Sequence, residues 1–195
     1  MAECLMHGLN VLGISLPSEM IKKEEKFLQE LLRWNKKVNL TSIDNLLEAQ
    51  EKHLLDSLVL VNYLKKDGRL LDMGSGGGLP GIPLAIAYPE LEVTSVDSVG
   101  KKINFQKHIK RLLNLKNLNP ICSRLENLDT TKKYDYVVAR ALSDISKLIE
   151  FAEPLLANDG QLLVMKGPEG LEELTKFFAE KKETGFVIAD QYDYF

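Results

Sequence analysis

The chain has 195 residues, 45% of them hydrophobic and 27% charged, and a formal net charge of −3. These values predict one soluble globular domain and exclude a wholly basic nucleic-acid coat, although a basic face is compatible with them. No apolar run reaches membrane-spanning length, the first residues lack the basic start of a signal peptide, and Cys4 and Cys122 have no metal-ligand spacing, so we expect no membrane, no metal and a reducing, cytoplasmic location.

Residues 1–66 are expected to form a helical extension. Residues 1–17 predict an arm or short helix that ends at Pro17, after which Ser18 suits an N-cap. From residue 19 to about residue 37, large apolar side chains recur at helical spacing and predict a stripe that packs against the main domain. That stripe consists of Met20, Phe27, Leu31, Trp34 and Val38.

The segment after that helix is expected to turn and then form two more helices. Its sequence NLTSID, 39–44, is typical of a turn, since its polar side chains can bond the nearby backbone. Asp44 is expected to cap a short helix that ends near Gln50. A further helix is expected over 52–64, where His53 and Asp56 share a face. That pair is either a local polar cluster or part of a site, and the sequence leaves both interpretations open.

Residues 70–83, LLDMGSGGGLPGIP, predict a buried strand, a tight loop and a helix N-terminus. Glycines adopt positive φ and let a ligand approach the backbone closely. The N-terminus of a helix adds unpaired N–H groups and the positive end of the helix dipole. Pro80 suits the first turn of a helix. The sequence therefore predicts a ligand site in this loop.

The identity of that ligand follows from the residue before the glycines. Gly76, Gly78 and Gly81 also match the dinucleotide fingerprint G-x-G-x-x-G. A carboxylate at Asp72 would repel a pyrophosphate and instead favours a cationic or amine-bearing ligand. The D-x-G-x-G-x-G order is that of methyltransferases that use S-adenosylmethionine. The candidate cofactor-binding residues are Asp72, Gly74, Ser75, Gly76 and Gly78.

A second strand, 92–97, ends at Asp97, twenty-five residues after Asp72. In doubly wound folds an acid at this position accepts the ribose hydroxyls of an adenosine ligand. The alternative role is a helix cap or turn. The preceding glycine loop favours the ligand role, so Asp97 joins the cofactor-binding candidates.

The next helix, 101–115, is basic on its outer side. Its apolar residues Phe105, Ile109, Leu112 and Leu113 are expected to face the core. A one-sign face in an acidic protein is compatible with a polyanionic partner and with a merely solvated surface, and the sequence leaves both interpretations open. The basic positions include Lys101, Lys102, Lys107, Lys110 and Arg111.

Two later strands bring cations to the same edge of the sheet. A strand over 134–141 ends in Arg140, at the edge where open α/β sheets bind ligands. A site role is favoured there over a salt bridge to Asp135 or Asp144. A strand over 161–167 is expected to place Lys166 beside Arg140.

The remaining elements complete an α/β fold. A short strand is expected over 117–122, a helix over 143–157, an NDG turn over 158–160, a helix over 168–182 and a last strand over 185–195. Strands alternate with helices after residue 68, which predicts a mostly parallel sheet with helices on both faces and right-handed crossovers. We expect a single domain over 1–195, with the helical extension at 1–66 and a Rossmann-like core at 67–195.

Seven motifs occur in an order and at intervals that resemble one family. They are NLTS, HLLDS, DMGSGGGLPGIPLA, VDSVGKK, SRLE, VARA and VMKG. The chain resembles the bacterial ribosomal RNA small-subunit methyltransferase G family, also called glucose-inhibited division protein B. This resemblance implies a class I enzyme that transfers methyl from S-adenosylmethionine to N7 of one guanine in 16S ribosomal RNA of the small subunit or its precursor. We expect a monomer.

The resemblance also implies roles for individual residues. Gly74 and Leu79 match positions that touch the cofactor, and Leu125 and Glu126 match the pair near its adenine. Arg140 matches an arginine at the cofactor and substrate site, where it would position the substrate. Lys101, Lys102 and Lys166 match family motifs and are candidates for RNA binding.

The chain departs from the family at its C-terminal end. The seven-stranded methyltransferase sheet normally ends in a hairpin, and the family continues with an Arg-rich return strand. This sequence stops at Phe195, so we expect the last of the usual seven strands to be absent.

The expected chemistry needs no catalytic nucleophile. Guanine N7 has an available lone pair, and the sequence has neither the Pro-Cys motif of cytosine C5 methylation nor an Asp/Asn-Pro-Pro-Tyr/Phe motif. Alignment of N7 with the methyl group would supply much of the catalysis. Two other functions remain open, a methyltransferase of small molecules and a non-catalytic RNA-binding protein.

Overall fold

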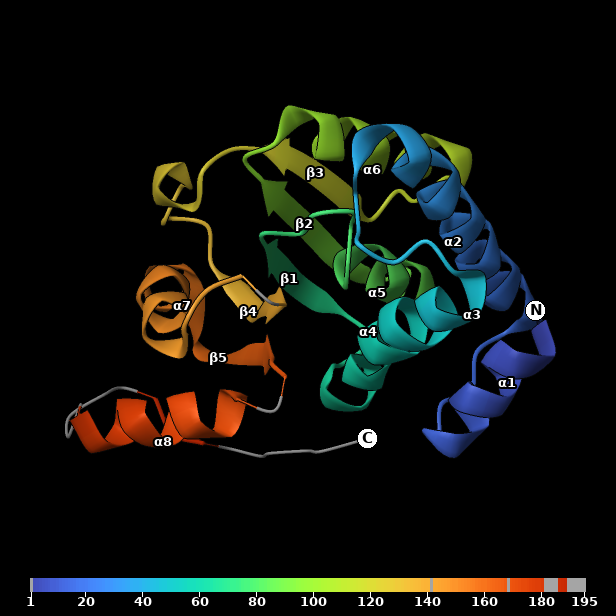
Figure 1. Cartoon of the computed structure of the whole chain (residues 1–195). Coiled ribbons are helices and arrows are strands. Elements are labelled where there is room, and N and C mark those ends of the chain that lie inside the picture. Colours follow the sequence, from blue (N-terminus) through green and yellow to red (C-terminus); the bar gives the residue numbers. More distant parts are fainter. Residues whose placement is uncertain (1, 141, 168, 181–185, 189–195) are drawn as a thin grey trace.

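A five-stranded sheet lies at the centre of the computed structural model, which describes residues 2–140, 142–167, 169–180 and 186–188 (Figure 1). The strand order is β3-β2-β1-β4-β5, and every pair of neighbours is parallel. The strands are β1 (Gly68–Met73), β2 (Leu91–Asp97), β3 (Leu118–Cys122), β4 (Tyr134–Arg140) and β5 (Leu156–Met165). The predicted α/β class is confirmed.

Helices cover both faces of this sheet (Figure 1). The larger apolar cluster lies between one face and the helices α1 (Ala2–Val11), α2 (Ser18–Val38), α3 (Leu46–Ala49), α4 (Asp56–Leu58), α5 (Gly81–Ala87) and α6 (Gly100–Leu112). The smaller cluster lies under α7 (Ile145–Ala152), and α8 (Gly170–Glu180) packs on α7. Short helical turns complete the order, η1 (Gln50–Leu55), η2 (Val59–Tyr63), η3 (Leu125–Asn127) and η4 (Glu153–Leu155).

The apolar stripe of α2 packs as the sequence predicts. Phe27 and Leu31 are fully buried, and α2 contacts α5 and α6. The Trp34 ring lies 5.5 Å from the Phe105 ring and 5.1 Å from the His108 ring, centroid to centroid. The extension and the sheet thus share one apolar core.

Two predictions for residues 44–64 are wrong. Asn45, not Asp44, caps α3, because its side chain accepts hydrogen bonds from the backbone N–H groups of Leu47 and Glu48. The expected single helix is instead three segments, the π-helical η1, the short α4 and the 3₁₀-helical η2. A π-turn of this kind is frequent at functional sites.

Two details of the second half also differ from expectation. Leu112 is 43% exposed while Leu113 is buried, because α6 turns Ile103, Phe105 and Ile109 to the core and ends at Leu112. The NDG segment is not a turn before β5 but an irregular part of it, since Leu156 pairs with Tyr134 and Gln161 already pairs with Tyr136.

The expected last strand lies largely outside the described residues. Of that segment, residues 186–188 are described and have no regular secondary structure. No helix in the described part of the chain is long and apolar enough to cross a membrane.

Glu24 on α2 is a buried acid, and its burial lowers the stability of the folded protein. Its side chain is fully buried, and neither carboxyl oxygen has a hydrogen-bond partner among the described residues. Burial raises the pKa of Glu24 well above its usual value of 4.5. The folded protein therefore binds a proton that the unfolded chain has lost, and stability falls as the pH rises above 4.5.

We expect Glu24→Met to raise the free energy of unfolding at pH 7 by about 1–3 kcal/mol, because it replaces an unsatisfied polar group with an apolar one of similar shape. Urea denaturation measures this, and the gain over the native protein should shrink as the pH falls towards 4.5. Glu19→Met is the control, because the Glu19 side chain is 81% exposed and its ion pair within the described part of the chain is with Lys23 on the same helix. A lower stability of Glu24→Met would contradict this reading.

Candidate functional site: the carboxyl edge of the sheet

The candidate residues lie at the topological switch point of the sheet, where the strand order reverses between β1 and β4. β1 lies between β2 and β4, so the chain crosses to one side after β1 and to the other after β3. Ligands of open α/β sheets bind at this switch point, outside the carboxyl ends of the strands. Asp72 lies near the carboxyl end of β1, the glycine loop follows that strand, Asp97 ends β2, and Arg140 ends β4. The fold therefore brings the predicted site residues to one edge.

The glycine loop is held by backbone and side-chain hydrogen bonds. The Ser75 N–H donates to the Val96 carbonyl at 2.9 Å, and the Ser75 carbonyl accepts from Gly78 and Leu79. The Gln106 amide donates to Ser75 Oγ at 2.8 Å and to the Gly76 carbonyl at 2.9 Å. The loop is thus shaped before any ligand arrives.

Gln106 is the site residue that sequence reasoning missed. It is fully buried on α6, and its Oε1 accepts a 2.6 Å hydrogen bond from Ser95 Oγ on β2. The sequence does contain a sign of this role, because Gln106 is a polar residue between Ile103 and Ile109 on the apolar face of the helix. A buried amide on such a face must find partners, and here they belong to the glycine loop.

Three glycines of the loop have left-handed backbone, Gly74 at φ 68°, Gly76 at φ 54° and Gly78 at φ 86°. A Cβ added to Gly78 would come within 2.2 Å of Ile82 Cδ1, and one at Gly74 within 2.3 Å of Leu142 Cδ1. A Cβ at Gly76 would meet nothing closer than the Gly74 carbonyl oxygen at 3.9 Å. Gly76 is therefore the position where the protein leaves space for something else.

Asp72 lies fully buried under this loop with one oxygen unsatisfied. Its Oδ2 accepts a 2.9 Å hydrogen bond from the Gly81 N–H, while Oδ1 has no partner among the described residues. Burial raises the pKa of Asp72 to about 7, with a smaller rise from Asp97, against lowering by the Gly81 hydrogen bond and by Arg140. An unsatisfied buried carboxylate oxygen fits an ammonium group, so the donor set suits an amine-bearing cofactor.

This raised pKa predicts how cofactor affinity depends on pH. An ammonium group binds the ionised form of Asp72, which dominates only above about pH 7. We expect the affinity for S-adenosylmethionine to fall about tenfold per pH unit below 7, and to fall again above about pH 8, where the amine of the ligand loses its proton. Calorimetry between pH 5.5 and 8.5 measures this, and Asp72→Asn should bind weakly with little pH dependence. A flat profile in the native protein would exclude Asp72 as the counter-ion.

Asp97 holds the loop as well as facing the expected ribose position. Its Oδ2 accepts from the Gly76 N–H at 3.0 Å, and its Oδ1 accepts from the Val99 N–H at 2.8 Å. Lys102 Nζ lies 3.7 Å from Asp97 Oδ2. Each oxygen keeps a lone pair for a ligand hydroxyl, so the ribose role stays a prediction.

Arg140 is paired with the helical extension rather than with Asp135 or Asp144. Its Nη2 donates to Asp56 Oδ2 at 2.9 Å and to the Lys52 carbonyl of η1. Its Nη1 is buried and has no partner among the described residues. Asp56 thereby contacts the candidate site, a role that the sequence left open.

His53, on the same π-helical turn, is engaged elsewhere. Its Nε2 lies 2.7 Å from Thr41 Oγ1, and Thr41 Oγ1 also accepts from the Ile43 N–H. Burial, and then Arg140, lowers the pKa of His53. A neutral, hydrogen-bonded imidazole of this kind ties the turn at 39–44 to η1.

The remaining candidates are less close to the centre of the site. Lys166 follows β5 at the expected edge, but its ammonium donates to Glu173 Oε2 and to the Ser143 carbonyl, both at 2.6 Å. Leu125 is half-buried and Glu126 exposed in η3, after β3. Lys101 is exposed in the first turn of α6. The described residues contain no cluster of three His, Cys, Asp or Glu side chains that could hold a metal ion.

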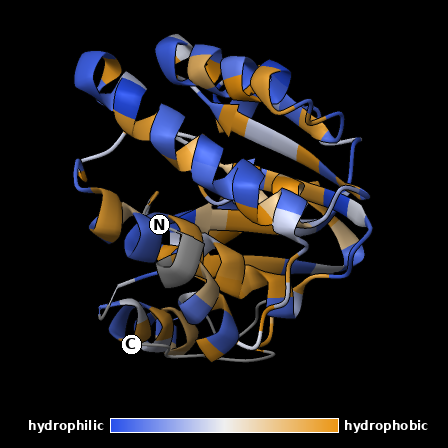
Figure 2. Cartoon of the chain, turned by 90° about the vertical axis from the view of Figure 1, so that its right-hand side faces the viewer, coloured by the Kyte–Doolittle hydropathy of each residue, from blue (hydrophilic) through white to orange (hydrophobic). Residues whose placement is uncertain are grey.

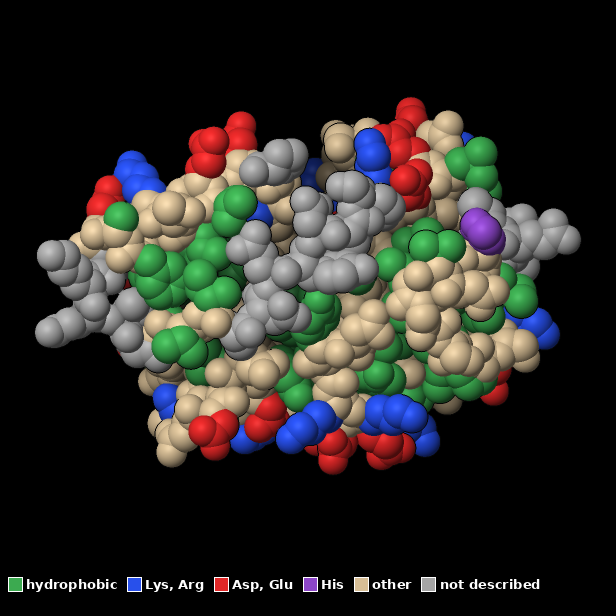
Figure 3. Space-filling model, turned by 90° about the horizontal axis from the view of Figure 1, so that it is seen from below, with side chains coloured by type: hydrophobic (Ala, Val, Ile, Leu, Met, Phe, Trp, Pro, Cys, Tyr) green, Lys and Arg blue, Asp and Glu red, His purple; other side chains and the backbone are tan. Residues whose placement is uncertain are grey.

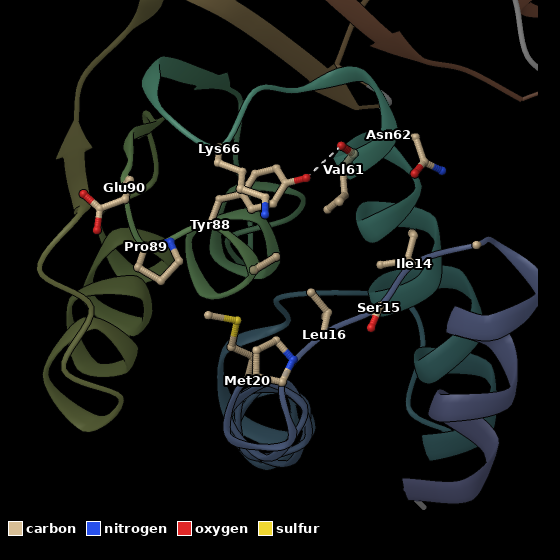
Figure 4. Close-up of a pocket in the computed structure, with 13 residues that line it drawn as sticks. Ile14, Ser15, Leu16, Met20, Val61, Asn62, Lys66, Tyr88, Pro89 and Glu90 are labelled. Carbon is tan, nitrogen blue, oxygen red and sulfur yellow. Dashed lines mark hydrogen bonds between the residues drawn. The ribbon is translucent and has the colours of Figure 1, made fainter.

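A cavity of about 350 Å³ lies at the opposite, amino end of the sheet (Figure 4). The linker between α1 and α2 lines it together with the first turn of α2, η2 and the turn before β2, through residues such as Leu16, Met20, Val61 and Tyr88. The Tyr88 hydroxyl donates to the Val61 carbonyl at 3.1 Å across one side. This cavity does not contain the glycine loop and is separate from the candidate site.

Solved structures that resemble this chain share its fold. Coclaurine N-methyltransferase bound to N-methylheliamine and SAH superposes with a TM-score of 0.56 at 18% identity, over 83% of this chain and 55% of that one. The ribosomal protein L11 methylase from Lactobacillus delbrueckii subsp. bulgaricus superposes with a TM-score of 0.55 at 20% identity, over 66% of this chain and 67% of that one. The predicted class of methyltransferase fold is confirmed.

Closer relatives share the sequence itself. The ribosomal RNA small subunit methyltransferase G of Syntrophotalea carbinolica is 47% identical over 186 residues, 94% of this chain and 86% of that protein. The protein of the same name from Geotalea uraniireducens is 40% identical over 192 residues, 97% of this chain and 88% of that one. The family model described as rRNA small subunit methyltransferase G, GidB, matches residues 20–188. By both its sequence and the fold that carries its glycine loop, this chain belongs to the rRNA small subunit methyltransferase G (GidB) family.

Proposed function

We propose that this protein transfers the methyl group of S-adenosylmethionine to N7 of one guanine in 16S ribosomal RNA, in the small ribosomal subunit or its precursor. Membership of the family supports the reaction class. The observation in this chain that carries the proposal is the buried Asp72 under the glycine loop, with Oδ1 unsatisfied and open space at Gly76. A buried acceptor beside an open backbone fits the amine of this cofactor.

The cofactor would lie along the carboxyl edge of the sheet. Asp72 would bind its amine, the backbone at Gly74, Ser75, Gly76, Gly78 and Leu79 would line its path, Asp97 would accept its ribose hydroxyls, and Leu125 and Glu126 would border its adenine. When bound, the cofactor supplies an electrophilic methyl group on a sulfonium. Everything else required of the site is positioning, because guanine N7 has an available lone pair and loses no proton before attack.

Arg140 would position the guanine. An arginine can donate to both O6 and N7 of a guanine edge, but a donor on N7 would occupy the attacking lone pair. The Nη1 of Arg140 would therefore bind O6 or a phosphate, while Asp56 and the Lys52 carbonyl hold Nη2. His53, bonded to Thr41, is not needed as a base.

Further properties belong to the same proposal. The helical extension at 1–66 and the core at 67–195 would form one methyltransferase domain that acts as a monomer in the cytoplasm without a metal ion. Lys101, Lys102 and Lys166 stay candidates for RNA contacts; the pairs of Lys102 with Asp97 and of Lys166 with Glu173 make Lys101 the best placed.

Mapping the methylated product tests this proposal. The protein is incubated with labelled S-adenosylmethionine and small-subunit particles from cells that lack the modification, and the 16S RNA is then treated with borohydride and aniline. Strand scission at one guanine reports 7-methylguanosine. Label in RNA without scission would exclude N7. Label in a small molecule but not in RNA would support a small-molecule methyltransferase. RNA binding without methyl transfer would support a non-catalytic RNA-binding protein.

A further inference from the structure

Positive charge is concentrated on two helices of this acidic protein. The helices α2 and α6 carry eleven Lys or Arg against four Asp or Glu, a net charge of +7. The rest of the chain carries fourteen against twenty-four, a net charge of −10. Elsewhere the signs mix, as on the face that Figure 3 shows from below, where cationic and acidic side chains alternate along one edge. The two helices are therefore unlike the remaining surface.

The four acids of α2 do little to neutralise that charge. Glu24 and Glu30 are buried, Glu25 is half-buried, and Glu19 lies at the far N-terminal end, where it pairs with Lys23. From Lys26 to the end of α2 and along all of α6, every exposed ionisable side chain is a cation. Figure 2, which turns α2 towards the viewer, shows its outer side as mostly hydrophilic.

A buried carboxylate joins the two helices side by side. Glu30 Oε2 on α2 lies 3.1 Å from His108 Nε2 on α6 and 2.6 Å from Arg33, and Glu30 Oε1 lies 3.7 Å from Lys26. The Trp34 ring packs 5.1 Å from the His108 ring. Because Glu30 is only 6% exposed, it fixes the seam without adding negative charge to the surface.

Helical geometry places the cations along this seam. At about 100° per residue, Lys26, Arg33 and Lys37 lie within about 60° of Glu30 around α2. Lys101 and Arg111 lie within about 60° of His108 around α6 by the same count. All five are exposed. We call these five residues the seam cations.

The seam leads to the candidate site. In the second half of α2, Leu31 lies against Gly77 of the glycine loop, and so does Leu40 just after the helix. At the N-terminal end of α6, Lys102 pairs with Asp97. A chain that follows the seam cations therefore arrives at the loop where the methyl donor would lie.

We propose that the seam between α2 and α6 binds the phosphodiester backbone of the RNA substrate and guides it to the glycine loop. The inference rests on the proposed function and adds the surface that holds the substrate outside the reacting nucleotide. A row of exposed cations without acids suits the regularly spaced phosphates of RNA. An anionic membrane is disfavoured, because the apolar side of α2 is buried in the core and is not available to enter a lipid surface.

The test compares two triple variants with the same change in charge. The seam variant combines Lys37→Gln, Lys101→Gln and Arg111→Gln, none of which pairs with Glu30. The control variant combines Lys65→Gln, Lys147→Gln and Lys176→Gln, exposed lysines before β1, on α7 and on α8. Binding of 16S ribosomal RNA is measured by filter retention between 50 and 300 mM salt, and binding of S-adenosylhomocysteine by calorimetry.

We expect the seam variant to bind RNA roughly 100-fold more weakly near 0.1 M salt, with a salt dependence reduced by about 2–3 in log–log slope, because three phosphate contacts are lost. The control variant should bind like the native protein, and both should retain their affinity for S-adenosylhomocysteine. Equal loss in both variants, or no loss in the seam variant, would overturn the proposal. So would binding of anionic vesicles in place of RNA. If RNA binding depends on the seam cations but no methyl is transferred to RNA, the proposed function is wrong, while the seam is still supported as the RNA-binding surface.

Discussion

Gly76→Ala is expected to abolish measurable binding of S-adenosylmethionine while the protein stays folded. Apart from its two chain neighbours, the added Cβ would meet no atom of the described residues closer than 3.9 Å, so we expect its main clash to be with a ligand that uses this space. The left-handed backbone at φ 54° costs an alanine about 1–2 kcal/mol, which a native domain tolerates. We expect a loss of affinity of at least about 100-fold, equivalent to about 2.8 kcal/mol of binding free energy. Calorimetry measures the affinity, and circular dichroism the fold.

Gly13→Ala is the matched control for that experiment. Gly13 has a similar backbone, φ 68°, and a Cβ there would also meet nothing within 4 Å. It lies on the linker between α1 and α2, at the opposite end of the sheet. Both variants therefore carry the same strain, and only Gly76→Ala should lose the cofactor. Gly78→Val discriminates less well, because its side chain would collide with Ile82 as well. Native affinity in Gly76→Ala would remove the loop from the site.

Arg140→Ala is expected to lower turnover by about 100-fold or more, because misplacement of a reacting group by about 1 Å costs that much. The cofactor affinity should fall less than the rate of methyl transfer if the main role of Arg140 is to position the guanine. Arg140→Lys should recover only part of the rate, since lysine keeps the charge but not the two-pronged guanidinium. Single-turnover methyl transfer to small-subunit particles measures these effects.

Asp56 provides a test of how Arg140 is held. Asp56→Asn removes the charge that pairs with Nη2 at 2.9 Å but leaves the Lys52 carbonyl in place. We expect a smaller loss than for Arg140→Ala, and little further loss when the two substitutions are combined, because residues in one ion pair are not independent. Additive losses would mean that Asp56 acts on its own.

The cysteines are the control for the chemistry. Attack by guanine N7 needs no covalent enzyme intermediate, so replacing both Cys4 and Cys122 with alanine should leave turnover largely intact. Cys122 is exposed after β3, and its Sγ makes only a weak 3.8 Å contact with the Ser98 carbonyl. Dependence of turnover on either cysteine would indicate covalent chemistry at a pyrimidine instead.

The sequence by itself determined the α/β class, the order of the five described strands along the chain, and the glycine loop between Asp72 and Gly81. Each of these depends on residues that are neighbours in the chain. A buried strand followed by glycines, or an apolar stripe on a helix, is encoded in local periodicity and in the backbone conformations that glycine and proline permit. The family motifs fall in the same segments.

Only the tertiary structure decided which polar groups pair with one another. Arg140 pairs with Asp56 at the start of α4, Lys166 is occupied by Glu173, and Gln106 reaches from α6 into the glycine loop. Glu30 turns two separate basic helices into one continuous surface. These contacts join residues far apart in the chain or depend on which side chains packing turns inward, and no local pattern records either. The charge of the seam was thus visible in the sequence, while its continuity and its direction towards the site were set by how α2 packs on α6.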